Sequence, residues 1–107
     1  MDRSGGVVSR QDGRRPVLAI IGNGGAIDVE LRHGAHELGR RAIDAGFRVV
    51  TGGLGGVMDA ASEGARSSPA WRDGDMIGVL PSYDRTTANS HVDIVVPTGL
   101  QLGRNVV

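Results

Sequence analysis

Two stretches of the chain decide its fold: VLAIIGNGG at residues 17–25 and FRVVTGGLGG at residues 47–56. Each is a short apolar run that ends in a cluster of glycines. An apolar run without polar alternation indicates a parallel strand that is buried on both faces. We therefore expect strands over 17–21 and 47–51, each followed by a tight turn.

A helical pattern follows each glycine cluster. Behind the first, apolar residues recur at spacings of four and three and predict a helix that ends near Gly46. Its apolar stripe consists of Ile27, Leu31, Ala35, Leu38 and Ala42. Behind the second, VMDAASEGARS at 57–67 predicts a helix whose small residues allow it to lie close to a sheet.

The rest of the sequence continues this alternation. We expect a third strand, MIGVLP, at 76–81, a polar loop at 82–91, a fourth strand, VDIVVP, at 92–97 and the opening of a further helix at 99–107. Strands that alternate with helices predict a parallel sheet with right-handed crossovers. The expected fold is therefore α/β, a Rossmann-like parallel sheet with flanking helices.

Composition excludes several classes of function. The 107 residues include no cysteine, which excludes disulfides, thiolate metal sites and cysteine nucleophiles. All twelve basic residues are arginine, which excludes lysine chemistry, and twelve acidic residues balance them, so nucleic acid is not an expected partner. The sequence shows no membrane span and no secretory signal, and we expect a cytoplasmic location. We expect residues 1–15 to be disordered and residues 16–107 to form one nucleotide-binding domain.

The glycine clusters are the candidate ligand site. In open parallel sheets, ligands bind at the carboxyl ends of the strands, where helix N-termini attract anions. Glycines there allow the backbone to approach a phosphate closely. The candidates are Gly22, Asn23, Gly24, Gly52, Gly53, Gly55 and Gly56. The alternative interpretation is that both clusters are only tight connections between a strand and a helix.

The second unit also resembles a known family. TGGLGGVMDAASEGA at 51–65 resembles the glycine-rich segment of the LOG-like (Lonely Guy, or lysine-decarboxylase-like) Rossmann superfamily, especially its subgroup resembling molybdenum cofactor carrier proteins. The subgroup's order and spacing are followed by IGVLP at 77–81, the Asp84-Arg85…Ala88-Asn89 loop, VDIVVPTG at 92–99 and the pair Arg104-Asn105. The resemblance extends over roughly residues 17–107.

The resemblance implies a phosphorylated nucleotide or a molybdopterin-type cofactor as the ligand, usually in a homodimer. It adds Met58, Thr98 and Asn105 to the ligand-binding candidates and makes Arg104 a candidate catalytic residue. Hydrolytic members of the superfamily carry a further segment, GG-x-GT-x-x-E, whose glutamate serves the reaction. The chain contains no such segment, so we expect it to be the N-terminal part of a LOG-type domain, truncated at its C-terminus.

Three functions follow as hypotheses. The first is binding, without transformation, of a molybdenum cofactor or an AMP-like nucleotide. The second is LOG-type phosphoribohydrolase activity on nucleoside 5′-monophosphates, which the missing glutamate opposes. The third is an inactive half-domain that associates with a partner chain or with a second copy. Two helices leave one face and one edge of a four-stranded sheet uncovered, which favours such association.

Other polar residues are assigned no site. His33 and His36 lack the carboxylate of a zinc motif, so no metal is expected. Asp59 begins a helix, where it complements the helix dipole. His91 belongs to the polar loop and is interpreted as an ordinary loop residue. Trp71, in a polar turn, is either a packing residue or an interface anchor.

Overall fold

The computed structural model describes residues 14–100 and contains one parallel sheet with two α-helices. Its strands are β1 (Val17–Ala19), β2 (Arg48–Thr51), β3 (Met76–Leu80) and β4 (Ile94–Pro97), paired in that spatial order. Helix α1 (Val29–Asp44) connects β1 to β2, and α2 (Val57–Ser67) connects β2 to β3. The Rossmann-like α/β fold expected from the sequence is confirmed.

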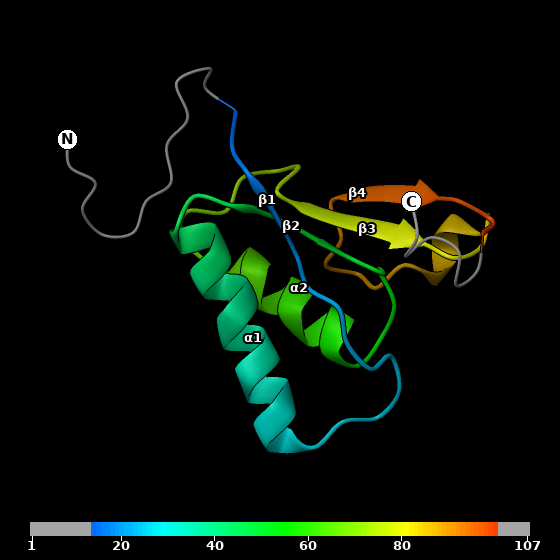
Figure 1. The fold of residues 1–107 in the computed structure, drawn as a ribbon, viewed down its shortest axis with the longest axis horizontal. Helices are drawn as coiled ribbons and strands as arrows, with labels where there is room; N and C mark the ends of the chain where they lie inside the picture. The colour runs from blue at the N-terminus through cyan, green and yellow to red at the C-terminus, as the bar shows by residue number, and fades with distance from the viewer. Residues whose placement is uncertain (1–13, 101–107) are drawn as a thin grey trace.

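Both helices cover the same face of the sheet (Figure 1). The strands have the same order in the sheet as in the sequence. Because crossovers between parallel strands are right-handed, the helices that connect them then lie on one side of the sheet. The side chains beneath the helices form the core: Val49, Met76 and Leu80 are fully buried at the centre of the sheet. The glycine turns lie at the carboxyl ends of β1 and β2, where both helices begin.

The expectation that the strands are buried on both faces is wrong. On the face that carries no helix, alternate side chains stay exposed: Val17 is 53% exposed, Ile94 42% and Val96 39%. Ile77, whose register partner is Ile94, is only partly buried. The apolar runs are continuous because both faces are apolar, but the described residues supply helices for only one of them.

The two helices pack through small residues. A Cβ added at Gly39 of α1 would lie 2.9 Å from the carbonyl carbon of Ala61 in α2. The buried residues of α1 are Ala35, Gly39, Ala42 and Ile43. Leu31 and Leu38, expected in the buried stripe, are each 48% exposed, because the close approach of α2 centres the contact on small residues instead.

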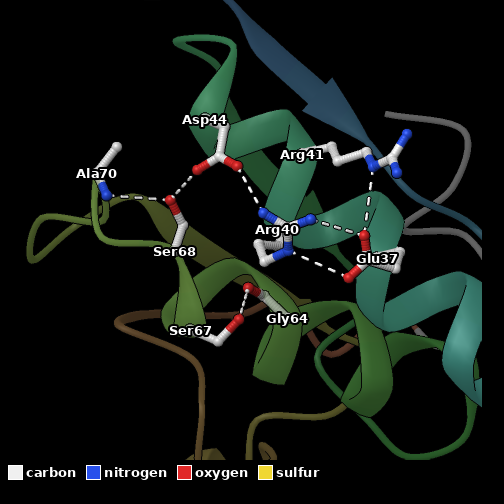
Figure 2. Close-up of polar contacts among 8 residues, drawn as sticks. All are labelled: Glu37, Arg40, Arg41, Asp44, Gly64, Ser67, Ser68 and Ala70. Atoms are coloured by element: carbon white, nitrogen blue, oxygen red, sulfur yellow. Dashed lines mark hydrogen bonds and ion pairs between the residues drawn. The ribbon is translucent and has the colours of Figure 1, made fainter.

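Ion pairs line the exposed side of α1, and a hydrogen bond joins its end to the turn after α2 (Figure 2). Arg40 donates to Glu37 at 2.7 Å and to Asp44 at 2.9 Å, and Arg41 donates to Glu37 at 3.3 Å. The hydrogen bonds from Arg40, together with Arg41, lower the pKa of Glu37 to about 2. Ser68 donates its hydroxyl to Asp44 and so ties the two helices together at this end.

Element boundaries differ from the expected ones by at most two residues. Helix α2 spans 57–67 as expected, whereas β4 begins at Ile94 rather than residue 92. The reason is Asp93, whose carboxylate accepts the N–H of Met76 at 3.0 Å and the indole N–H of Trp71 at 2.8 Å. Within the loop 82–91, residues Arg85–Thr87 form a short 3₁₀ helix, η2.

Two expected segments lie largely outside the described part of the chain. The disorder expected over 1–15 and the helix expected over 99–107 fall mostly on residues that the structure does not describe. In the described residues, none of the helices combines the length and apolar character needed to cross a membrane. The cytoplasmic location stays a prediction.

Candidate functional site

The two glycine loops pack against each other at the carboxyl edge of the sheet. The carbonyl of Asn23 accepts the N–H of Val57, the first residue of α2, at 2.8 Å. A Cβ added at Gly22 would lie 2.6 Å from Cγ1 of Val57, and one at Gly24 would lie 3.0 Å from the methyl carbon of Met58. The structure therefore brings loop 22–25 and the start of α2 into direct contact.

Two glycines of the second loop have backbone conformations that residues with a side chain rarely adopt. Gly53 has φ +78° and Gly56 has φ +63°. A Cβ at Gly53 would point into the sheet, 2.7 Å from Cδ2 of Leu80, and one at Gly56 would lie 2.6 Å from the carbonyl oxygen of Gly25. Both glycines are therefore needed to close the loop on its neighbours, whether or not a ligand is bound.

Gly55 differs from these two glycines. A Cβ added there would lie 3.1 Å from the carbonyl oxygen of Gly24 and has no other severe contact. Gly55 therefore faces the first glycine loop. A side chain added at Gly55 would narrow the gap between the two loops and would disturb little else. Gly52, the first glycine of the cluster, directly follows β2 and is half-buried.

The N-terminus of α2 is the feature of this edge best suited to an anion. Its N-cap, Gly56, has no side chain to accept a hydrogen bond. Among the described residues, the Asn23 carbonyl takes the Val57 N–H, and no acceptor is found for the N–H groups of Met58 and Asp59. These donors and the positive end of the helix dipole favour a negatively charged group.

Asn89 is a contact residue that the sequence candidates did not include. Its backbone N–H donates to the carbonyl of Gly53 at 2.8 Å, and its side-chain amide donates to the carbonyl of Leu54 at 2.9 Å. The polar loop after β3 therefore holds the second glycine loop in place. Asn89 belongs to a loop that carries part of the family resemblance, but neither that resemblance nor its place in a polar loop assigned it a contact with the glycines.

Of the remaining candidates, one lies beside the glycine loops, one lies apart from them and two lie outside the described residues. Met58 is buried against Gly24, so its side chain packs beneath the first loop. Thr98 follows β4, where its hydroxyl donates to the carbonyl of Leu80 at 2.7 Å. Arg104 and Asn105 lie outside the described part of the chain.

Asp59 joins three segments on the outer side of α2. Its carboxylate accepts a hydrogen bond from Arg32 of α1 at 2.9 Å and lies 3.9 Å from Nε2 of His91 in the polar loop. Asp59 therefore has a structural ion pair besides its favourable place in the first helical turn. No group of three potential metal ligands exists among residues 14–100.

Trp71 is a packing residue rather than an exposed anchor. It lies against the core, donates its indole N–H to Asp93 and carries the guanidinium of Arg66 at 4.5 Å from its ring centroid. The structure thus gives Trp71 a packing role within the described chain.

Comparison with known proteins agrees with this architecture. Residues 15–107 match the model of the SLOG cluster4 family. The chain is 33% identical to the molybdenum cofactor binding protein of Rippkaea orientalis, with a TM-score of 0.77 over 86% of this chain and 55% of that one. A molybdenum cofactor carrier protein from Chlamydomonas reinhardtii gives 32% identity and a TM-score of 0.70 over 88% and 56%.

A relative from Archaeoglobus fulgidus is 32% identical over 90 residues, which are 84% of this chain and 56% of that protein. The chain thus spans about half the length of the relatives that it matches. Because the family match covers most of the sequence, the chain belongs to the SLOG cluster4 family.

Proposed function

We propose that the chain binds a phosphate-bearing cofactor of the molybdopterin type, without transforming it, at the carboxyl edge of its sheet. The observation that carries the proposal is the N-terminus of α2, which lies between two mutually packed glycine loops and has no side-chain cap. The N–H groups of Met58 and Asp59 are donors that a phosphate can use there. The two similar structures named for molybdenum cofactor support this choice of ligand.

The residues present fit a phosphate group better than they fit a metal ion. Glycines surround the helix N-terminus, and the one carboxylate in its first turn, Asp59, is paired with Arg32. An AMP-like nucleotide carries the same phosphate and is the practical probe of the site. The base or pterin ring would extend from the phosphate over the strand ends, and the backbone donors of α2 would fix only its phosphate.

Binding can be tested by calorimetry with AMP on the wild-type chain and on Gly55→Val. The valine narrows the gap between Gly55 and Gly24, so affinity should fall at least tenfold while the helical circular dichroism stays unchanged. Gly34→Val is the matched control, because a Cβ at this exposed position has no neighbour within 4 Å. Equal affinity in all three proteins would refute the site.

We also propose that the chain associates with a second copy through the helix-free face of its sheet. The exposed apolar side chains of Val17 on β1 and of Ile94 and Val96 on β4 lie on this face, at the two outer strands of the sheet. The hydrolase alternative has no observation in its favour among the described residues, since the candidate Arg104 lies outside them.

A further inference from the structure

A hollow lies at the edge of the sheet opposite the glycine loops. It has a volume of about 550 Å³ and is lined by Arg14, Arg15, Arg48, Arg72 and Asp73. Parallel strands begin at one edge and end at the other, and these residues stand at the beginnings. Arg15 precedes β1, Arg48 opens β2 and Arg72 precedes β3. The function proposed above uses none of them.

One buried carboxylate holds three of these arginine-bearing segments together. Asp75 has a fully buried side chain and forms an ion pair with Arg15. It also accepts the backbone N–H of Arg72 at 2.9 Å and lies 3.9 Å from Nε of Arg48. A buried carboxylate needs such partners to offset its lost hydration. Asp75 therefore fixes the backbone positions from which the guanidinium groups reach the hollow.

The positive charge around the hollow exceeds the negative charge. Apart from Arg14, three arginines of the described chain face two carboxylates, Asp73 on the rim and Asp75 beneath, which leaves one positive charge in excess. Arg72 makes no ion pair with any of the residues 14–100, and Arg48 has only the long contact to Asp75. Arginine stays protonated at every relevant pH, so this excess persists.

We propose that this hollow, which we call the arginine pocket, binds a small molecule that carries more than one phosphate group. Planar guanidinium groups match phosphate oxygens through paired hydrogen bonds. A volume of about 550 Å³ lies within the range of small-molecule sites and exceeds what a single phosphate fills. The pocket is separate from the glycine loops, and its ligand is not that of the proposed function.

Pyrophosphate is the probe for the arginine pocket, titrated calorimetrically into the 107-residue chain. Arg48→Gln and Arg72→Gln should each weaken binding roughly tenfold, because each removes a charge-assisted hydrogen bond. Asp73→Asn should tighten binding several-fold, because it removes the negative charge on the rim. Arg41→Gln makes the same charge change at an exposed position on α1 and should have less than a twofold effect.

Three results would overturn the proposal. The first is no saturable binding at millimolar pyrophosphate. The second is a loss of affinity in Arg41→Gln equal to that in Arg48→Gln and Arg72→Gln, which would show an effect of net charge alone. The third is loss of binding in Gly55→Val, which would place pyrophosphate at the glycine loops instead. If an arginine variant does not fold, the test is an NMR titration of the wild-type chain with pyrophosphate, which follows the Nε–H resonances of Arg48 and Arg72. They should shift on titration, and unchanged resonances would refute the pocket.

Discussion

Replacing Gly39 by alanine tests whether close helix packing stabilises this fold. The added Cβ would lie 2.9 Å from the carbonyl carbon of Ala61, 3.0 Å from the backbone nitrogen of Ala65 and closer still to the Ala61 oxygen. All three atoms are backbone, so no side chain can move aside. Helix α1 must shift away from α2 and loosen the contacts of Ala35 and Ala42.

Overpacking of this kind costs about 1–3 kcal/mol, and we expect the upper part of that range because the obstruction is backbone. Alanine gains about 1 kcal/mol over glycine in a helix interior, which leaves a net loss of about 1–2 kcal/mol. Gly34→Ala on the same helix gains the same propensity with no neighbour within 4 Å and should stabilise the chain by up to about 1 kcal/mol.

Urea unfolding followed by circular dichroism measures both variants. Gly39→Ala should lower the midpoint and Gly34→Ala should raise it, with equal slopes. A Gly39→Ala chain as stable as Gly34→Ala would refute the helix packing described above.

Three further predictions concern charge, chemistry and assembly. Hydrogen bonds from Arg40 hold the pKa of Glu37 near 2, so its stabilising effect is present above the ordinary value of 4.5 and is lost as pH falls towards 2. An NMR titration of the Glu37 carboxyl with a midpoint near 4.5 would contradict this. Incubation with AMP should release no adenine, because these 107 residues contain no GG-x-GT-x-x-E segment, whose glutamate serves cleavage of the N-glycosidic bond in the hydrolytic members. Adenine release that disappears in Arg104→Ala would establish the hydrolase instead. The exposed apolar face should cause the chain to associate at tens of micromolar, which light scattering would detect. A monodisperse monomer whose unfolding does not depend on protein concentration would contradict this prediction.

Sequence periodicity predicted the order and type of the elements because each apolar run and each small-residue stripe is a local signal. The bounds of α2 followed from one such stripe. Exposure could not be predicted in the same way. An apolar run such as VLAII has the same pattern whether one or both faces are covered, and only the placement of α1 and α2 shows that Val17 and Ile21 stay exposed.

Contacts between distant residues were likewise beyond the sequence. The sequence indicated that the glycine clusters lie at strand ends. It did not indicate that Leu80 leaves no room for a side chain at Gly53, or that the carbonyl of Gly25 leaves none at Gly56. The arginine pocket is lined by residues 14, 15, 48, 72 and 73, which belong to three segments separated by tens of positions and share no motif. Such a site arises from strand pairing, which brings the beginnings of parallel strands together.

The most direct test of the central claim is a map of backbone amide shifts as AMP is added to the isotope-labelled chain. A phosphate held at the N-terminus of α2 should produce its largest shifts at Gly55, Gly56, Met58 and Asp59, the amides that surround the uncapped helix end. Largest shifts at Arg48 and Arg72, or no shifts at saturating AMP, would contradict phosphate binding at the glycine loops.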